Sequence, residues 1–201
     1  GWSGWYDLRS GLPSLARGRG IPWVAGAGNG LKESGAVTVE RLETLARDFI
    51  DRHPALLGRW NGQLVLDRAA SGRLGKDIWQ ITFRQVVGGV PVQGARLNLH
   101  VSHGNLVAFG ADRWGDTGPV GAPTVTAAAA RAALLRYMGV SPLETVEVLP
   151  ARRALVAAPA ADAGRRFAGR VGEGISFRQV WEFAVRVRGE RGTWVGRIDA
   201  L

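Results

Sequence analysis

The clearest pattern of apolar and polar positions runs from Ile78 to Gly110. Apolar and polar residues alternate on both sides of Gly88-Gly89, and a period of two is typical of half-buried antiparallel strands. The apolar positions are Trp79, Ile81, Phe83, Ala95, Leu97, Leu99 and Val101. Gly88-Gly89 suits a two-residue hairpin turn, and Gly104-Asn105 suits a second turn before a third strand at 106–109. The pattern predicts a three-stranded meander with one apolar face.

A helical pattern lies upstream of this meander. Thr38 is a suitable N-cap, the apolar stripe extends to about Arg52, and Pro54 cannot continue the helix. The stripe consists of Val39, Leu42, Leu45, Phe49 and Ile50. We expect this helix to cover the apolar face of the meander, with a loop and a short strand at 56–66 and a surface turn at 68–75.

Residues 1–35 show no sustained period and are rich in Gly, Trp and Arg. Their aromatic residues are too apolar for a free tail. These are Trp2, Trp5, Tyr6 and Trp23. We therefore expect an extended N-terminal arm that lies on a neighbouring part of the protein.

The stretch from Gly115 to Pro123 is rich in glycine and proline and predicts an internal boundary. After it, Thr126 can cap an alanine-rich helix that Gly139 and Pro142 would end. Its expected apolar stripe is Ala130, Leu134, Tyr137 and Met138. Strands are predicted at 145–149, 154–158, 181–188 and 193–200, with a loop at 159–174.

The predicted fold class is therefore α+β. We expect two tandem units, each a helix packed on an antiparallel β-sheet meander, preceded by the extended arm. The expected boundaries are 1–35 for the arm, 36–118 for the first unit and 119–201 for the second.

Residues of the meander follow a recognisable order. An aromatic residue and a glutamine precede Gly-Val-Pro-Val, a small glycine-containing step and an alternating strand. The residues concerned are Phe83, Gln85, Gly88, Gly89, Val90, Pro91, Val92 and Gly94. This order resembles the fungalysin/thermolysin propeptide (FTP) domain over about 56–110. The resemblance implies a non-catalytic pro-region that acts as intramolecular chaperone and inhibitor of a secreted zinc metalloendopeptidase.

In the second half, an alanine-rich helix, several strands and the closing pair Asp199-Ala200 resemble the PepSY domain, which commonly follows the propeptide domain in such precursors. The alternative is a pair of unrelated α+β units that need turn residues at the same places.

The net charge of +9 comes almost wholly from arginine, since Lys32 and Lys76 are the only lysines. Such a charge admits nucleic acid, an anionic membrane surface or an acidic protein as partner. The arginines are spread along the chain, which favours solvated positions over a nucleic-acid stripe. Trp79 and Phe83 could stack on bases only if they were exposed, and their alternation with Ile81 places them in the core.

The residues that catalysis would need do not form a site in this sequence. There is no cysteine, and none of His53, His100 and His103 belongs to an H-E-x-x-H helix. His100 and His103 would point to opposite faces of a strand. The glycines at 26–30 do not make a phosphate-binding loop, and the aspartates at 112–116 lack the ligand ladder of a calcium loop. We expect no enzyme activity and no cofactor in this segment.

By the resemblance, the zinc and the catalytic glutamate belong to a downstream catalytic domain, which is the expected partner in cis. Candidate contact residues are Arg84, Arg96, Asn98 and His100 on the meander and Arg197 and Asp199 near the C-terminus. The expected localisation is secreted or extracytoplasmic, for a trimmed segment without its signal peptide; no apolar run is long enough to span a membrane. The alternative functions are a free-standing PepSY-type inhibitor or envelope binding module and, after these, a basic nucleic-acid-binding domain.

Overall fold

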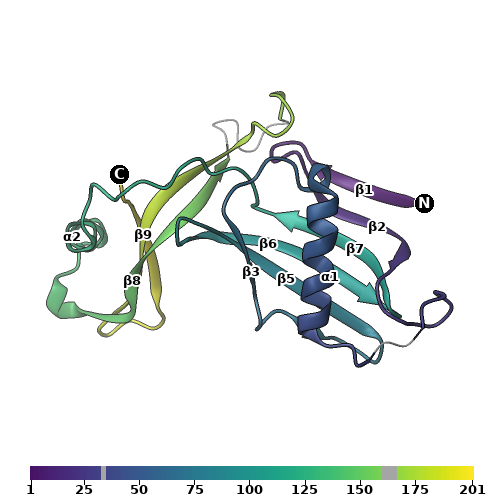
Figure 1. The fold of residues 1–201 in the computed structure, drawn as a ribbon. Coiled ribbons are helices and arrows are strands. Elements are labelled where there is room, and N and C mark those ends of the chain that lie inside the picture. The colour runs from purple at the N-terminus through teal and green to yellow at the C-terminus, as the bar shows by residue number, and fades with distance from the viewer. Residues whose placement is uncertain (33–34, 160–166) are drawn as a thin grey trace.

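The computed structural model describes residues 1–32, 35–159 and 167–201 (Figure 1). Within these residues the fold is α+β, with two α-helices and ten strands in one mixed sheet. The elements of the N-terminal part are β1 (Trp2–Asp7), β2 (Leu12–Pro22), α1 (Val39–Arg52), β3 (Gln63–Leu66), β4 (Gly72–Arg73), β5 (Ile78–Val87), β6 (Val90–Ser102) and β7 (Asn105–Asp112). The C-terminal part contains α2 (Ala127–Met138), β8 (Thr145–Pro159), β9 (Ile175–Val187) and β10 (Trp194–Asp199).

The predicted meander is confirmed as β5, β6 and β7. Val87 pairs with Val90 across the turn, where Gly88 and Gly89 have φ angles of 55° and 78°. Side chains with bulk at Cβ rarely adopt such angles, which explains the glycine pair. The alternating apolar residues are buried except Trp79, which is partly buried, and Ile81 and Phe83 are fully enclosed.

Helix α1 lies across the apolar face of the meander, as expected (Figure 1). The Thr38 hydroxyl accepts a hydrogen bond from the Arg41 backbone N–H at 3.2 Å, which confirms the predicted cap. The helix buries Leu42, Ala46, Phe49 and Ile50 against the sheet. Its loss would leave one face of the meander in water.

The N-terminal segment is extended, as predicted, but it is regular rather than irregular. Strands β1 and β2 form a hairpin, and β2 pairs with β7 through Ala16 and Phe109. Leu12 and Trp23 are buried in the same core as the meander. The backbone of β7 offers an edge that needs partners, so this segment extends the sheet.

Two smaller expectations were also incomplete. The predicted surface turn at 68–75 contains β4, which pairs with β5. The two strands expected at 145–149 and 154–158 are one strand, β8, whose register shifts between Glu147 and Arg152. An irregular register interrupts the alternation that would have indicated a single strand. The predicted loop at 159–174 lies partly outside the described residues.

Helix α2 packs on β9 and β10 through a small core of Ala130, Leu134, Phe183 and Val185. The Thr126 hydroxyl accepts a hydrogen bond from the Ala129 N–H at 3.2 Å, as the capping prediction required. The expected stripe was wrong at Tyr137, which is 90% exposed, whereas Leu135 is buried. The buried stripe of the helix is narrow, with Ala130, Leu134 and Leu135 as its buried residues.

Strands of the two halves do not form separate sheets. The order runs β1-β2-β7-β6-β8-β9-β10, and β6 also pairs with β5. Strand β7 pairs with residues 96–102 of β6. Nearer the start of β6, Val92 pairs in parallel with Leu155 of β8. Leu155 and Phe177 pack with the core of the first half. The long β8–β9 hairpin thus joins the two halves.

Candidate protein-interaction surface

The glutamine of the recognised residue order ties the meander to the segment that follows it. Gln85 is fully buried, and its side-chain amide donates to the backbone carbonyls of Asn61 at 2.8 Å and Gly115 at 2.6 Å. Its carbonyl accepts from the Gly115 N–H at 3.3 Å. Asn61 in turn accepts from Thr117. The sequence indicated Gln85 only by its place in the motif. The structure shows its physical role, which is to hold the backbone at Asn61 and Gly115 against β5.

The meander face opposite α1 carries the predicted contact arginines. Arg84 and Arg96 pair directly across β5 and β6, and both side chains are exposed. Asp67 lies 3.5 Å from Arg84, and Asp112 is the partner of Arg96 on β7. Each arginine thus has an acidic neighbour in its own chain, and both guanidinium groups remain exposed to solvent.

Asn98 and His100 lie on the same face, but both are partly enclosed. Asn98 accepts a hydrogen bond at 2.8 Å from the buried hydroxyl of Thr82. Burial lowers the pKa of His100 below its ordinary value, because the charged imidazolium is less well solvated there. The structure therefore gives Asn98 a partner inside the sheet and leaves the two arginines as the more accessible members of the set.

Arg197 is engaged within the C-terminal half. Glu182 on β9 is buried and accepts hydrogen bonds from Arg152 at 2.9 Å and from Arg197 at 2.8 Å. Burial by itself raises the pKa of Glu182, but the hydrogen bonds from the two arginines outweigh burial, so that the pKa lies below the ordinary 4.5. Arg197 is thus hydrogen-bonded to a buried carboxylate of its own chain. Asp199, the other candidate near the C-terminus, accepts a hydrogen bond from the Leu201 N–H.

The predicted contact residues fall into two groups in the sheet. Strands β8 and β9 stand between β6, which carries Arg96, and β10, which carries Arg197. Sequence reasoning missed the N-terminal hairpin, where the Arg17 guanidinium lies 5.1 Å from the centre of the Trp5 ring. The sequence does contain a signal for a strand here, because Arg17 and Arg19 alternate with small residues at 16, 18 and 20.

In the part of the chain that the structure describes, no three His, Asp or Glu side chains lie together as a metal site would require. No helix among those residues is long and apolar enough to cross a membrane. Phe83 is enclosed beneath α1 and Trp79 packs against the same core. Phe83 is therefore unavailable for stacking on bases, and Trp79 is only partly exposed.

A family model described as the Fungalysin/Thermolysin Propeptide Motif matches residues 80–112. The match begins within β5, includes β6 and ends with β7, so it coincides with the meander. It does not reach the second half, and nothing in the comparisons supports the resemblance of 119–201 to a PepSY domain. No curated protein matches the chain. The motif suggests a metallopeptidase propeptide region, which is non-catalytic.

Proposed function

We propose that residues 1–201 act as the pro-region of a secreted thermolysin- or fungalysin-type zinc metallopeptidase, serving as its folding assistant and inhibitor. The observation that carries the proposal is the propeptide motif at 80–112. That motif coincides with a folded meander whose open face presents Arg84 beside Arg96. The zinc and the catalytic glutamate would belong to the peptidase.

Both roles follow from ordinary physical chemistry. A preformed sheet offers a surface on which slow non-local contacts of the peptidase can assemble, which lowers the entropy cost of closing its loops. While the two parts are tethered, an effective concentration of about millimolar keeps even a modest contact occupied. Cleavage of the tether would return the affinity to its intermolecular value, and the inhibitor could then leave.

The division into an arm at 1–35, an FTP-like unit at 36–118 and a PepSY-like unit at 119–201 remains part of this proposal. Separate cores under α1 and α2 support the last boundary. The net charge of +9 supports an acidic partner surface, which the Arg84–Arg96 pair would face.

The test is inhibition in trans. Peptide hydrolysis by a mature thermolysin-type metallopeptidase of the same organism is followed against the concentration of the chain. We expect saturable inhibition, and we expect the double variant Arg84→Glu, Arg96→Glu to weaken it about tenfold through unfavourable charge. Arg186→Glu is the matched control, because Arg186 is an exposed arginine on β9, outside the matched motif.

Equal inhibition by the double variant and the control would show that Arg84 and Arg96 do not contribute to binding of the peptidase. Absence of inhibition, together with no increase in the refolding yield of the denatured peptidase, would refute the pro-region proposal.

A further inference from the structure

Strand β1 lies at one end of the strand order and pairs, within the described residues, only with β2 (Figure 1). Natural edge strands are usually blocked by proline, by basic residues or by their short length. Between Trp2 and Trp5, β1 has no charged residue or proline, and its register is regular until the shift between Trp5 and Tyr6. Residues Trp2 to Trp5 therefore form a strand edge without any of these protective features.

Other margins of the sheet are less open. Strand β4 has only two residues, and the Leu64 carbonyl of β3 already accepts a hydrogen bond from the Arg47 side chain at 3.1 Å. Helix α2 packs against β10, and just beyond that strand the Ala200 carbonyl accepts a hydrogen bond from the Thr124 N–H at 2.9 Å. The contrast makes the bare β1 edge the best candidate for pairing with another chain.

Two hydrogen bonds show which backbone groups of β1 face outward. The Trp5 carbonyl accepts from the Ser14 hydroxyl at 3.1 Å, and the Asp7 carbonyl accepts from the Gly11 N–H at 2.8 Å. Both donors lie on the side of β2. Because successive residues of a strand point their backbone groups to opposite sides, those of Trp2, Gly4 and Tyr6 face the free edge.

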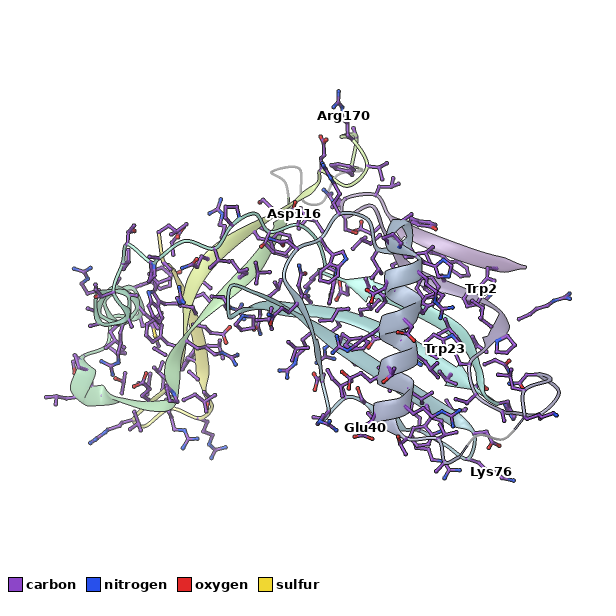
Figure 2. All side chains as sticks on the ribbon, in the orientation of Figure 1. Trp2, Trp23, Glu40, Lys76, Asp116 and Arg170 are labelled. Carbon is purple, nitrogen blue, oxygen red and sulfur yellow. The ribbon has the colours of Figure 1, made fainter. Side chains whose placement is uncertain are left out.

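The side chains of these residues lie beside an apolar groove. Trp2 packs on Phe109 with 5.7 Å between ring centres, and Figure 2 shows Trp2 at the end of the molecule away from α2. The groove has a volume of about 290 Å³ and its lining includes Trp2, Gly4, Tyr6, Phe49, Leu56 and Phe109. An added strand would place every second side chain over this groove.

Side chains on the opposite face of such a strand would meet positive charge. The Arg17 guanidinium lies over the Trp5 ring, and therefore above β1, and Arg19 is exposed on the same strand as Arg17. Asp7, the acidic residue of β1, already accepts hydrogen bonds from the Arg9 and Ser10 N–H groups. Charge complementarity therefore favours carboxylates at the alternate positions of an incoming strand.

We propose that the β1 edge binds an extended peptide segment of a partner, with apolar and acidic residues in alternation, by strand addition. The assignment of that segment to the metallopeptidase rests on the proposed function. The binding mode does not, because the edge and the groove are features of this chain.

The test is a nuclear magnetic resonance titration of the ¹⁵N-labelled chain with the probe peptide acetyl-Val-Glu-Val-Glu-Val-Glu-amide. We expect saturable shifts of the Trp2, Gly4 and Tyr6 amide signals. A probe with alternate N-methylated amides should lose binding, and a probe with lysine in place of glutamate should bind severalfold more weakly.

Gly4→Pro and Gly4→Ala form a matched pair of variants. Both add a Cβ, which at this position lies 3.1 Å from the Tyr6 ring, but only proline removes the outward N–H. We expect Gly4→Pro to raise the Kd of the probe about tenfold or more, and Gly4→Ala to change it less than about twofold. Thermal melting checks that both variants fold.

Absence of saturable shifts in Trp2–Tyr6 at millimolar probe, or equal Kd values for the two variants or for the methylated probe, would overturn strand addition. A dimer in sedimentation that Gly4→Pro dissociates would show that a second copy occupies the edge, and would overturn the assignment to a partner. Probe binding with neither inhibition of the peptidase nor an increase in its refolding yield refutes the proposed function alone. Inhibition without probe binding refutes strand addition alone.

Discussion

Replacing Gln85 by methionine separates the hydrogen bonds of this side chain from its volume. The two side chains are similar in size, but methionine cannot donate to the carbonyls of Asn61 and Gly115 or accept strongly from the Gly115 N–H. All three bonds connect β5 to segments more than twenty residues away, so the change acts on the tertiary fold.

The magnitude follows from the number of bonds. Each hydrogen bond contributes about 1 kcal/mol net, and the Gln85 side chain is fully buried. Loss of the three bonds should therefore lower the free energy of unfolding by about 3 kcal/mol. For a chain of 201 residues this corresponds to a fall in Tm of about 6–12 °C.

The assay is urea unfolding followed by tryptophan fluorescence. The signal comes from all eight tryptophans of the chain, and these include Trp114, which adjoins Gly115 and packs on Trp60 with 5.5 Å between ring centres. Gln63→Met is the matched control, because Gln63 is exposed on β3, and its effect should stay within about 0.5 kcal/mol.

A loss below about 1 kcal/mol for Gln85→Met, or an equal loss for Gln63→Met, would refute the role assigned to this glutamine. A fall in unfolding free energy with unchanged amide signals of residues 114–118 in the nuclear magnetic resonance spectrum of the folded state would show that the bonds stabilise the fold but do not position this segment.

Two further predictions concern the C-terminal half. Since the pKa of Glu182 is lowered in the folded state, its contribution to stability is present above pH 4.5 and is lost as the pH falls below that value. Glu182→Gln should therefore cost about 2 kcal/mol at pH 7 and clearly less at pH 3 by urea unfolding, and an equal cost at both pH values would contradict the ion-pair account. A Cβ at Gly196 would overlap the buried Leu134 side chain, so Gly196→Val should cost about 1–3 kcal/mol by displacing α2. Gly121→Val, where a Cβ meets open space, is the control, and similar thermal melting of the two variants would argue against that packing.

The local elements were predictable because their signals are local. The meander needed only a period of two and glycines at its turns, and the helices needed only a stripe and the caps Thr38 and Thr126. The failures were equally physical. Tyr137 fits a helical stripe by spacing, but its side chain is 90% exposed. The register shifts in β8 interrupt the alternation of apolar and polar residues, so one strand was predicted as two.

The candidate surface was predicted in part. The alternation placed Arg84, Arg96, Asn98 and His100 on one face, and the structure agrees that these residues share it. It could not reveal that Asn98 is tied to Thr82 or that Arg197 is tied to Glu182, because both partners are distant in sequence. Whether these residues contact a partner stays a prediction.

The sequence by itself determined which segments are strands of the meander, where its hairpin turns, where both helices begin, and which residues of the meander lie on the face opposite its apolar side. Only the tertiary structure decided which strands become neighbours. The backbone groups that join β2 to β7 and β6 to β8 are the same in every residue, so side-chain patterns do not encode their partners. Those choices depend on which apolar faces can be buried together, and they leave β1 at the open edge.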